Sequence, residues 1–98
     1  EADKATETVL NEVKKITSPL LFMGDLNLTP DDRRIQTLAA TLNDTAQRSD
    51  ESLLSFPADN PERKIDYIFT NDCFKTLRVE VPNVGNSDHR PIRAEIEL

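Results

Sequence analysis

The chain has 98 residues, enough for one domain at most, and its 31% of charged residues and net charge of −6 are typical of a globular protein. The acidic balance argues against a sequence-independent nucleic-acid coat, which needs a basic face. No apolar run approaches the roughly 18 residues of a membrane-spanning helix. The single cysteine, Cys73, excludes an internal disulfide and a cysteine zinc site.

The first predicted element is an amphipathic helix over residues 3–16. Its apolar residues recur at spacings of three and four, which places them on one face: Ala5, Val9, Val13 and Ile16. Lys14 and Lys15 are expected in its last turn, where they complement the helix dipole. The residues before this helix show no basic-then-apolar signal pattern, and localisation stays open.

A short apolar run follows at residues 20–23 and predicts a central strand that is buried on both faces. Thr-Pro-Asp-Asp at residues 29–32 then predicts a helix start, with Thr29 as the N-cap and Pro30 in the first helical position. Apolar residues at helical spacing extend this second helix over residues 30–42.

The rest of the chain predicts a loop and three strands. Residues 43–63 are polar and favour a long surface loop with a short strand near residues 53–56. Alternating apolar residues predict strands at 65–70, 76–81 and 92–98, with Leu77, Val79 and Val81 facing inward in the second. The expected fold class is α/β, with one mixed, largely antiparallel sheet that carries two helices on one face.

Two polar residues, Asp25 and Asn27, directly follow the first predicted strand in the sequence Gly-Asp-Leu-Asn. Crevices at the carboxyl ends of strands are the usual ligand sites of open α/β sheets. A carboxylate can orient or deprotonate a water, and a carboxamide can donate to a phosphoryl oxygen. The alternative is a turn in which these side chains bond their own backbone.

Asp66 lies inside the apolar run Ile-Asp-Tyr-Ile-Phe, where an unpaired carboxylate is costly. The only histidine of the chain, His89, is its best partner on chemical grounds. A carboxylate that bonds one ring nitrogen fixes the tautomer and raises the basicity of the imidazole. We therefore expect a direct hydrogen bond between Asp66 and His89. The alternative is an edge aspartate that faces solvent.

His89 belongs to the run Ser-Asp-His-Arg-Pro at residues 87–91, just before the last predicted strand. Side chains of adjacent residues at the start of a strand diverge. Asp88 can therefore face a metal ion while His89 faces the substrate.

Together and in this order, the three motifs resemble the C-terminal motifs of the endonuclease/exonuclease/phosphatase superfamily, whose fold is that of deoxyribonuclease I. The resemblance covers residues 1–98 as the C-terminal half of such a domain, which is one half of a four-layer α/β/β/α sandwich. It implies that Asp25 positions or activates the attacking water and that Asn27 binds the scissile phosphate. It further implies that Asp66 orients His89 toward the phosphate and that Asp88 contacts a Mg²⁺ or Mn²⁺ ion.

The resemblance implies a metal-dependent phosphoric ester hydrolase that uses activated water against a phosphodiester or a phosphomonoester. The main metal-binding glutamate of the family has no counterpart here, so we expect this half to be inactive alone. An N-terminal half or a second copy is expected to cover the inner sheet face. The alternative is a non-catalytic binding or assembly module on the same scaffold. Nucleic acid, phospholipid and small phosphates all remain open as substrates.

Overall fold

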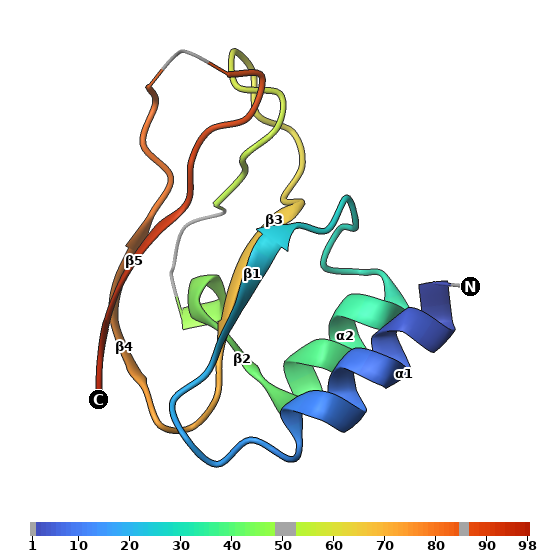
Figure 1. The fold of residues 1–98 in the computed structure, drawn as a ribbon. Helices are drawn as coiled ribbons and strands as arrows, with labels where there is room; N and C mark the ends of the chain where they lie inside the picture. The colour runs from blue at the N-terminus through green and yellow to red at the C-terminus, as the bar shows by residue number, and fades with distance from the viewer. Residues whose placement is uncertain (1, 49–52, 85–86) are drawn as a thin grey trace.

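The computed structural model describes residues 2–48, 53–84 and 87–98, and it contains two α-helices, one 3₁₀-helix and five strands in these ranges (Figure 1). In chain order they are α1 (Ala2–Val13), β1 (Leu21–Asp25), α2 (Arg33–Thr41), β2 (Asn43–Asp44), η1 (Thr45–Arg48), β3 (Asp66–Thr70), β4 (Lys75–Glu80) and β5 (Arg93–Glu97).

The described strands pair only antiparallel, and they form two sheets. One has three strands in the order β1-β3-β2, and the other is the β4–β5 hairpin. The predicted α/β class with antiparallel strands and two helices is confirmed, although the strands form two sheets where a single mixed one was expected. The register of the first sheet places Asp25 opposite Asp66, which decides the position of the candidate site.

Both helices lie side by side against one face of the three-stranded sheet (Figure 1). The core between these layers joins Leu10 of α1 and Leu38 of α2 to Tyr67 and Phe69 of β3. The Phe69 ring is fully buried and stacks on the rings of Tyr67, at 5.5 Å between centroids, and Phe22, at 6.3 Å. β3 is therefore the strand that ties the sheet to the helices.

Both helices are shorter than the sequence predicted. α1 ends at Val13, so Lys14 and Lys15 follow the helix and do not lie in its last turn. α2 begins at Arg33, and its N-cap is Asp32, whose carboxylate accepts a hydrogen bond from the Arg34 backbone N–H at 2.9 Å. The prediction of Thr29 as the cap was wrong, because the chain makes a turn there before the helix begins.

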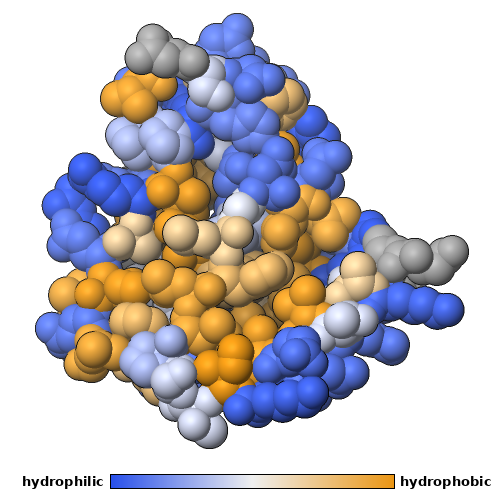
Figure 2. Space-filling view, viewed as in Figure 1, coloured by the Kyte–Doolittle hydropathy of each residue, from blue (hydrophilic) through white to orange (hydrophobic). Residues whose placement is uncertain are grey.

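The prediction that the first strand is buried on both faces is also wrong for this chain. β1 is an edge strand, with Leu21 43% exposed and Met23 61% exposed on the face away from the helices. Figure 2 shows apolar side chains gathered over this region. In β4, Leu77 is 52% exposed where it was expected to face inward, because the pairing with β5 shifts register between Thr76 and Arg78. The helices thus cover one sheet face and leave apolar residues on the other.

The segment at 43–63 is not simply a surface loop. It contains β2 and η1, and its described part buries Asp44, Thr45, Ala46, Leu53 and Ser55. Near the predicted strand at 53–56, the structure has one antiparallel bridge between Phe56 and Arg63. Residues 49–52 lie outside the described residues. Among the described helices, none is long and apolar enough to span a membrane.

Candidate active site

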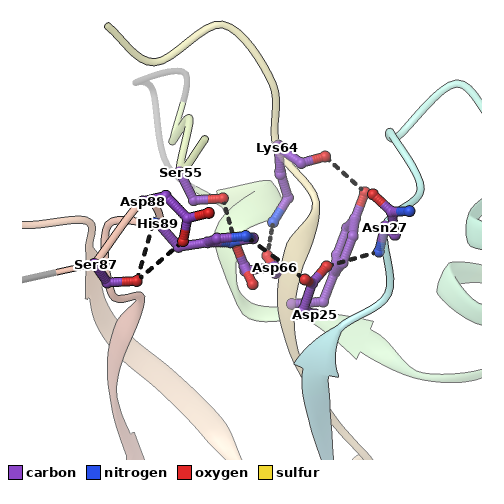
Figure 3. A network of polar contacts seen from close by, with 9 residues as sticks. Asp25, Asn27, Ser55, Lys64, Asp66, Ser87, Asp88 and His89 are labelled. Atoms are coloured by element: carbon purple, nitrogen blue, oxygen red, sulfur yellow. Dashed lines mark hydrogen bonds and ion pairs between the residues drawn. The ribbon is translucent and has the colours of Figure 1, made fainter. Parts of the chain in front are cut away.

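Side chains from three separate segments meet at one end of the three-stranded sheet (Figure 3). Asp25 ends β1, Asp66 begins β3, and His89 lies in the loop before β5. Antiparallel pairing places the end of β1 beside the start of β3, and the loop brings the imidazole to both. One ligand atom from each of the three side chains lies within 4.8 Å of the other two.

The predicted hydrogen bond between Asp66 and His89 is confirmed. His89 Nδ1 lies 2.8 Å from Asp66 Oδ2. This bond raises the pKa of His89 above its ordinary value of 6.5. Partial burial opposes the rise, and the negative charges of Asp66, Asp25 and Asp88 add to it. With Nδ1 held by the carboxylate, Nε2 is the ring nitrogen left to face a substrate.

Each carboxylate oxygen of Asp25 has a different neighbour. Oδ1 accepts a hydrogen bond from the Asn27 backbone N–H at 2.9 Å, which is the local turn expected as the alternative reading. Oδ2 points toward His89 Nε2 at 3.7 Å, beyond hydrogen-bond range. The structural turn and a role in chemistry are therefore compatible in this residue.

The backbone around Asp25 explains the residue types beside it. Gly24 has φ 149°, a conformation that side-chain-bearing residues rarely adopt. Asn27 has φ 54°, in the left-handed region that asparagine tolerates better than most residues. Gly24 still pairs with Tyr67 inside β1, Asn27 lies just after the strand, and the Asp25 side chain is exposed at the strand end.

The other two predicted site residues lie next to the group of three. Asn27 lies on the far side of Asp25 from His89 (Figure 3). Asp88 is exposed beside His89, and its Oδ1 accepts a weak hydrogen bond from Ser87 Oγ at 3.4 Å. The structure therefore brings Asp25, Asp66 and His89 together and places Asn27 and Asp88 on either flank.

Sequence reasoning missed Ser55 and Phe56. Ser55 Oγ donates to Asp66 Oδ2 at 2.6 Å, and the Phe56 ring packs on the His89 imidazole at 4.8 Å between centroids. A serine within the apolar run Leu-Leu-Ser-Phe at residues 53–56 was the available signal. Its position 11 residues before Asp66 gave no indication of the partner.

Lys64 and Tyr67 lie next to the site, and their side chains contact the backbone around it. Lys64 Nζ lies 3.7 Å from the buried carboxylate of Asp44 and 4.1 Å from the centre of the Tyr67 ring. Burial lowers the pKa of Lys64, and the charge of Asp44 opposes that shift. The Tyr67 hydroxyl donates to the Leu28 carbonyl at 2.8 Å, which fixes the loop after Asn27. Burial raises the pKa of Tyr67, so this hydroxyl remains a donor.

Open space borders the imidazole. A depression of about 350 Å³ is lined by Asp66, Ser87, His89 and Arg90, among others. The Arg90 side chain donates from Nε to the Ala58 carbonyl at 2.8 Å, which holds the wall of this depression in place. The His89 imidazole is therefore open to solvent on this side.

Comparison with solved structures identifies the fold. The chain is similar to a mannosyl-6-phosphatase of Bacteroides thetaiotaomicron VPI-5482, with a TM-score of 0.82 and 19% identity over 95% of this chain and 44% of that one. It is also similar to an endonuclease/exonuclease/phosphatase family protein of Bacteroides thetaiotaomicron, with a TM-score of 0.80 and 20% identity over 93% of this chain and 41% of that one. A third, from Bacteroides vulgatus, has a TM-score of 0.78 and 22% identity over 95% and 42%.

At these identities the likeness establishes the deoxyribonuclease I-like fold, and this chain spans less than half the length of each of these three structures. No curated protein matches the sequence. The sequence profile of the Endonuclease/Exonuclease/phosphatase family matches residues 3–89, which is most of the chain and includes every candidate site residue predicted above. The chain therefore belongs to the endonuclease/exonuclease/phosphatase family.

Proposed function

We propose that this chain supplies the C-terminal part of the active site of a divalent-metal-dependent phosphoesterase. The observation that carries the proposal is the convergence of Asp25, Asp66 and His89 from three segments. The alternative, a non-catalytic module, does not explain why the partly buried carboxylate of Asp66 orients the only histidine of the sequence. The phosphatase among the similar structures has a name consistent with phosphoester hydrolysis.

The proposed roles of His89, Asp25 and Asn27 depend on which of their side-chain atoms can reach a substrate. His89 Nδ1 is held by Asp66, so Nε2, when protonated, donates to a phosphoryl oxygen and stabilises the charge that develops there. Asp25 Oδ2 faces the same space and is the atom that orients the attacking water and accepts its proton. The Asn27 carboxamide is proposed to donate to another phosphoryl oxygen without adding negative charge.

A divalent cation fits the donor set at this site. Exposed carboxylates at Asp25 and Asp88 offer hard oxygen ligands, the type that Mg²⁺ and Mn²⁺ prefer. The ammonium group of Lys64 already contacts the Asp44 carboxylate and the Asp66 carbonyl. An anionic substrate would thus meet several carboxylates with little positive charge to offset them. We propose Asp88 as a ligand of such an ion, which would supply charge neutralisation and a more acidic bound water.

The sheet face that the helices leave uncovered indicates where the rest of the active site would lie. Leu21, Met23 and Asp25 alternate along β1 and share the face away from the helices. The similar structures are more than twice as long as the part that this chain matches. We propose that the other half of the fold covers this apolar face, so that its residues complete the active site. On this proposal, residues 1–98 alone are inactive.

The experiment is a hydrolysis assay on the 98-residue chain and on a longer polypeptide in which it is joined to the other half of the fold. p-Nitrophenyl phosphate reports phosphomonoesterase activity, and bis-p-nitrophenyl phosphate reports phosphodiesterase activity. Each is tested with Mg²⁺, with Mn²⁺ and with a chelator. We expect turnover only in the longer form with metal, and its loss in Asp25→Ala and His89→Ala.

Glu95→Gln, a change at an exposed carboxylate on β5, serves as the matched control and should retain activity. Metal-dependent turnover that survives both site variants would refute the proposed site. Turnover by the 98-residue chain alone, lost in the same variants, would keep the site and refute the need for a second half. No turnover from the longer form on either substrate would favour the non-catalytic alternative.

A further inference from the structure

Ser55 is a buried residue whose hydroxyl contacts Asp66, the hydrogen-bond partner of His89. Its exposed fraction is 1%, and it lies between the buried Leu53 and the half-buried Phe56. A buried hydroxyl needs a hydrogen-bond partner, and this one has the Asp66 carboxylate at 2.6 Å. That distance is typical of an O–H donor to a charged oxygen, which is among the stronger hydrogen bonds in proteins.

Both donors to Asp66 converge on the same oxygen atom. Ser55 Oγ lies 2.6 Å from Asp66 Oδ2, and His89 Nδ1 lies 2.8 Å from it. The terminal torsion of an aspartate side chain is soft and allows the carboxylate plane to rotate. Two donors on one oxygen define that plane better than the imidazole does alone. The position of His89 therefore depends on a carboxylate that Ser55 helps to hold.

The backbone of Ser55 forms hydrogen bonds to two of the three segments that meet at the site. Its N–H donates to the Arg63 carbonyl at 2.9 Å, just before β3, and its carbonyl accepts from the Arg90 N–H at 2.7 Å, just after His89. Ser55 thus lies between the segment that carries Asp66 and the loop that carries His89. These bonds place the Ser55 hydroxyl beside the Asp66 carboxylate.

We propose that Ser55 is a positioning residue that acts through Asp66 to hold His89 as one tautomer in one orientation. The inference rests on the proposed function, because an oriented imidazole matters most if His89 contacts a phosphate. A competing explanation is that the hydroxyl only satisfies a buried site in the loop. The two explanations differ in what removal of the hydroxyl does to the imidazole.

The test uses the only histidine of the chain as a reporter. Nitrogen-15 NMR of the histidine ring is recorded at one fixed, mildly alkaline pH for the wild type and for Ser55→Ala. The wild type should show the Nδ1–H tautomer with a slowly exchanging ring proton. In Ser55→Ala, we expect the population of the Nε2–H tautomer to rise about fivefold, the factor equivalent to one ordinary hydrogen bond. The exchange of the Nδ1 proton should accelerate as well.

Thr45 provides a matched control. It is also 1% exposed, and its hydroxyl donates at 3.0 Å to the Ile68 carbonyl of β3, but it does not bond Asp66. Thr45→Val removes a buried hydroxyl from the same strand neighbourhood and should leave the imidazole spectrum unchanged. Ser55→Thr restores the hydroxyl and should restore the wild-type spectrum. If Ser55→Ala fails to fold, Ser55→Cys keeps the side chain small, offers only a weak donor and carries the same test.

An unchanged imidazole spectrum in folded Ser55→Ala would overturn the inference, and so would an equal change in Thr45→Val. The NMR spectrum of the imidazole can be recorded whether or not the protein hydrolyses a phosphoester. Absence of turnover with the expected NMR change would count against the proposed function and leave the positioning role intact. Where turnover is present, Ser55→Ala should lower kcat about 10–100-fold with little change in KM, as for other groups that orient a functional histidine.

Discussion

His89 Nδ1 lies 2.8 Å from Asp66 Oδ2, although 23 residues separate the two in the chain. The start of β3 fixes the carboxylate, and the loop before β5 fixes the imidazole. Because both come from backbone held by the sheet or by loop hydrogen bonds, the pair is formed before any ligand arrives. Preorganised groups of this kind need no rearrangement when charge develops in a reaction.

Removal of either member of this pair should suppress hydrolysis in any form of the protein that shows it. We expect His89→Ala to lower kcat by about 10²–10⁴-fold, the usual contribution of a positioned acid or base. Asp66→Asn should cause a smaller loss, of about 10–100-fold, since the ring stays but its tautomer is no longer fixed. Steady-state kinetics on the model phosphoesters measures both. Equal activity of Asp66→Asn and the wild type would contradict the orienting role.

Because of the N-cap of α2, the free energy of unfolding should depend on pH in the acid range. The side-chain and backbone hydrogen bonds from Arg34 lower the pKa of Asp32 from 3.8 to about 2. A carboxyl group with a lowered pKa stabilises the fold above its unfolded pKa, and this contribution disappears as the pH falls through the folded value. The stability difference between wild type and Asp32→Ala should therefore be full near neutral pH and shrink between about pH 4 and 2.

Urea unfolding followed by circular dichroism at a series of pH values measures this difference. Glu97→Ala, at an exposed position of β5, controls for the general effect of removing one negative charge. A gap between wild type and Asp32→Ala that stays constant down to pH 2 would mean that the ionised carboxylate contributes nothing to the cap.

Phe69 should be among the most sensitive positions of the core. Its ring is fully buried and stacks on Tyr67 and Phe22, so truncation removes buried apolar area and leaves a cavity. We expect Phe69→Ala to lower the free energy of unfolding by about 3–5 kcal/mol, a large share of the total for a small domain. Phe74→Ala, at a half-buried position, should cost less. A loss below about 1 kcal/mol in urea unfolding would contradict this view of the core.

The fold class could be predicted because the spacing of apolar residues in each helix and strand follows which of its faces is buried. The alternation of Tyr67 and Phe69 marks the helix-covered face of β3, and both are buried, as is Ile65 just before the strand. The position of Asp66 on the opposite face follows from the same alternation. The pairing of Asp66 with His89 could be predicted because a carboxylate in an apolar strand needs a partner and the chain has only one histidine.

Other features depend on tertiary contacts that no local pattern encodes. Ser55 reaches Asp66 across an intervening loop, and nothing in its immediate neighbours specifies that contact. The apolar run at β1 indicated burial on both faces, but Leu21 and Met23 can be buried only by residues that this chain does not provide. If the proposed second half of the fold is present, the pattern of burial reflects the complete fold, of which this chain matches 44% in the mannosyl-6-phosphatase structure.

The exposed face of β1 should make the 98-residue chain associate. Leu21 is 43% exposed and Met23 is 61% exposed, and they share a sheet face with the exposed end of β1 at Asp25. Contiguous apolar surface of this kind usually marks an interaction site. We expect the isolated chain to self-associate at micromolar concentration in sedimentation velocity, and we expect Met23→Lys to weaken that association at least about tenfold, equivalent to 1.4 kcal/mol.

Because Met23 is exposed, the lysine variant should change the free energy of unfolding by no more than about 0.5 kcal/mol. Leu98→Lys is the matched control, since Leu98 is also apolar and exposed but follows β5. It should leave the association unchanged. Equal weakening by both variants would show that the contact is non-specific. Joined to the other half of the fold, the wild-type chain should sediment as a monomer, because the face that drives association is then covered within one molecule.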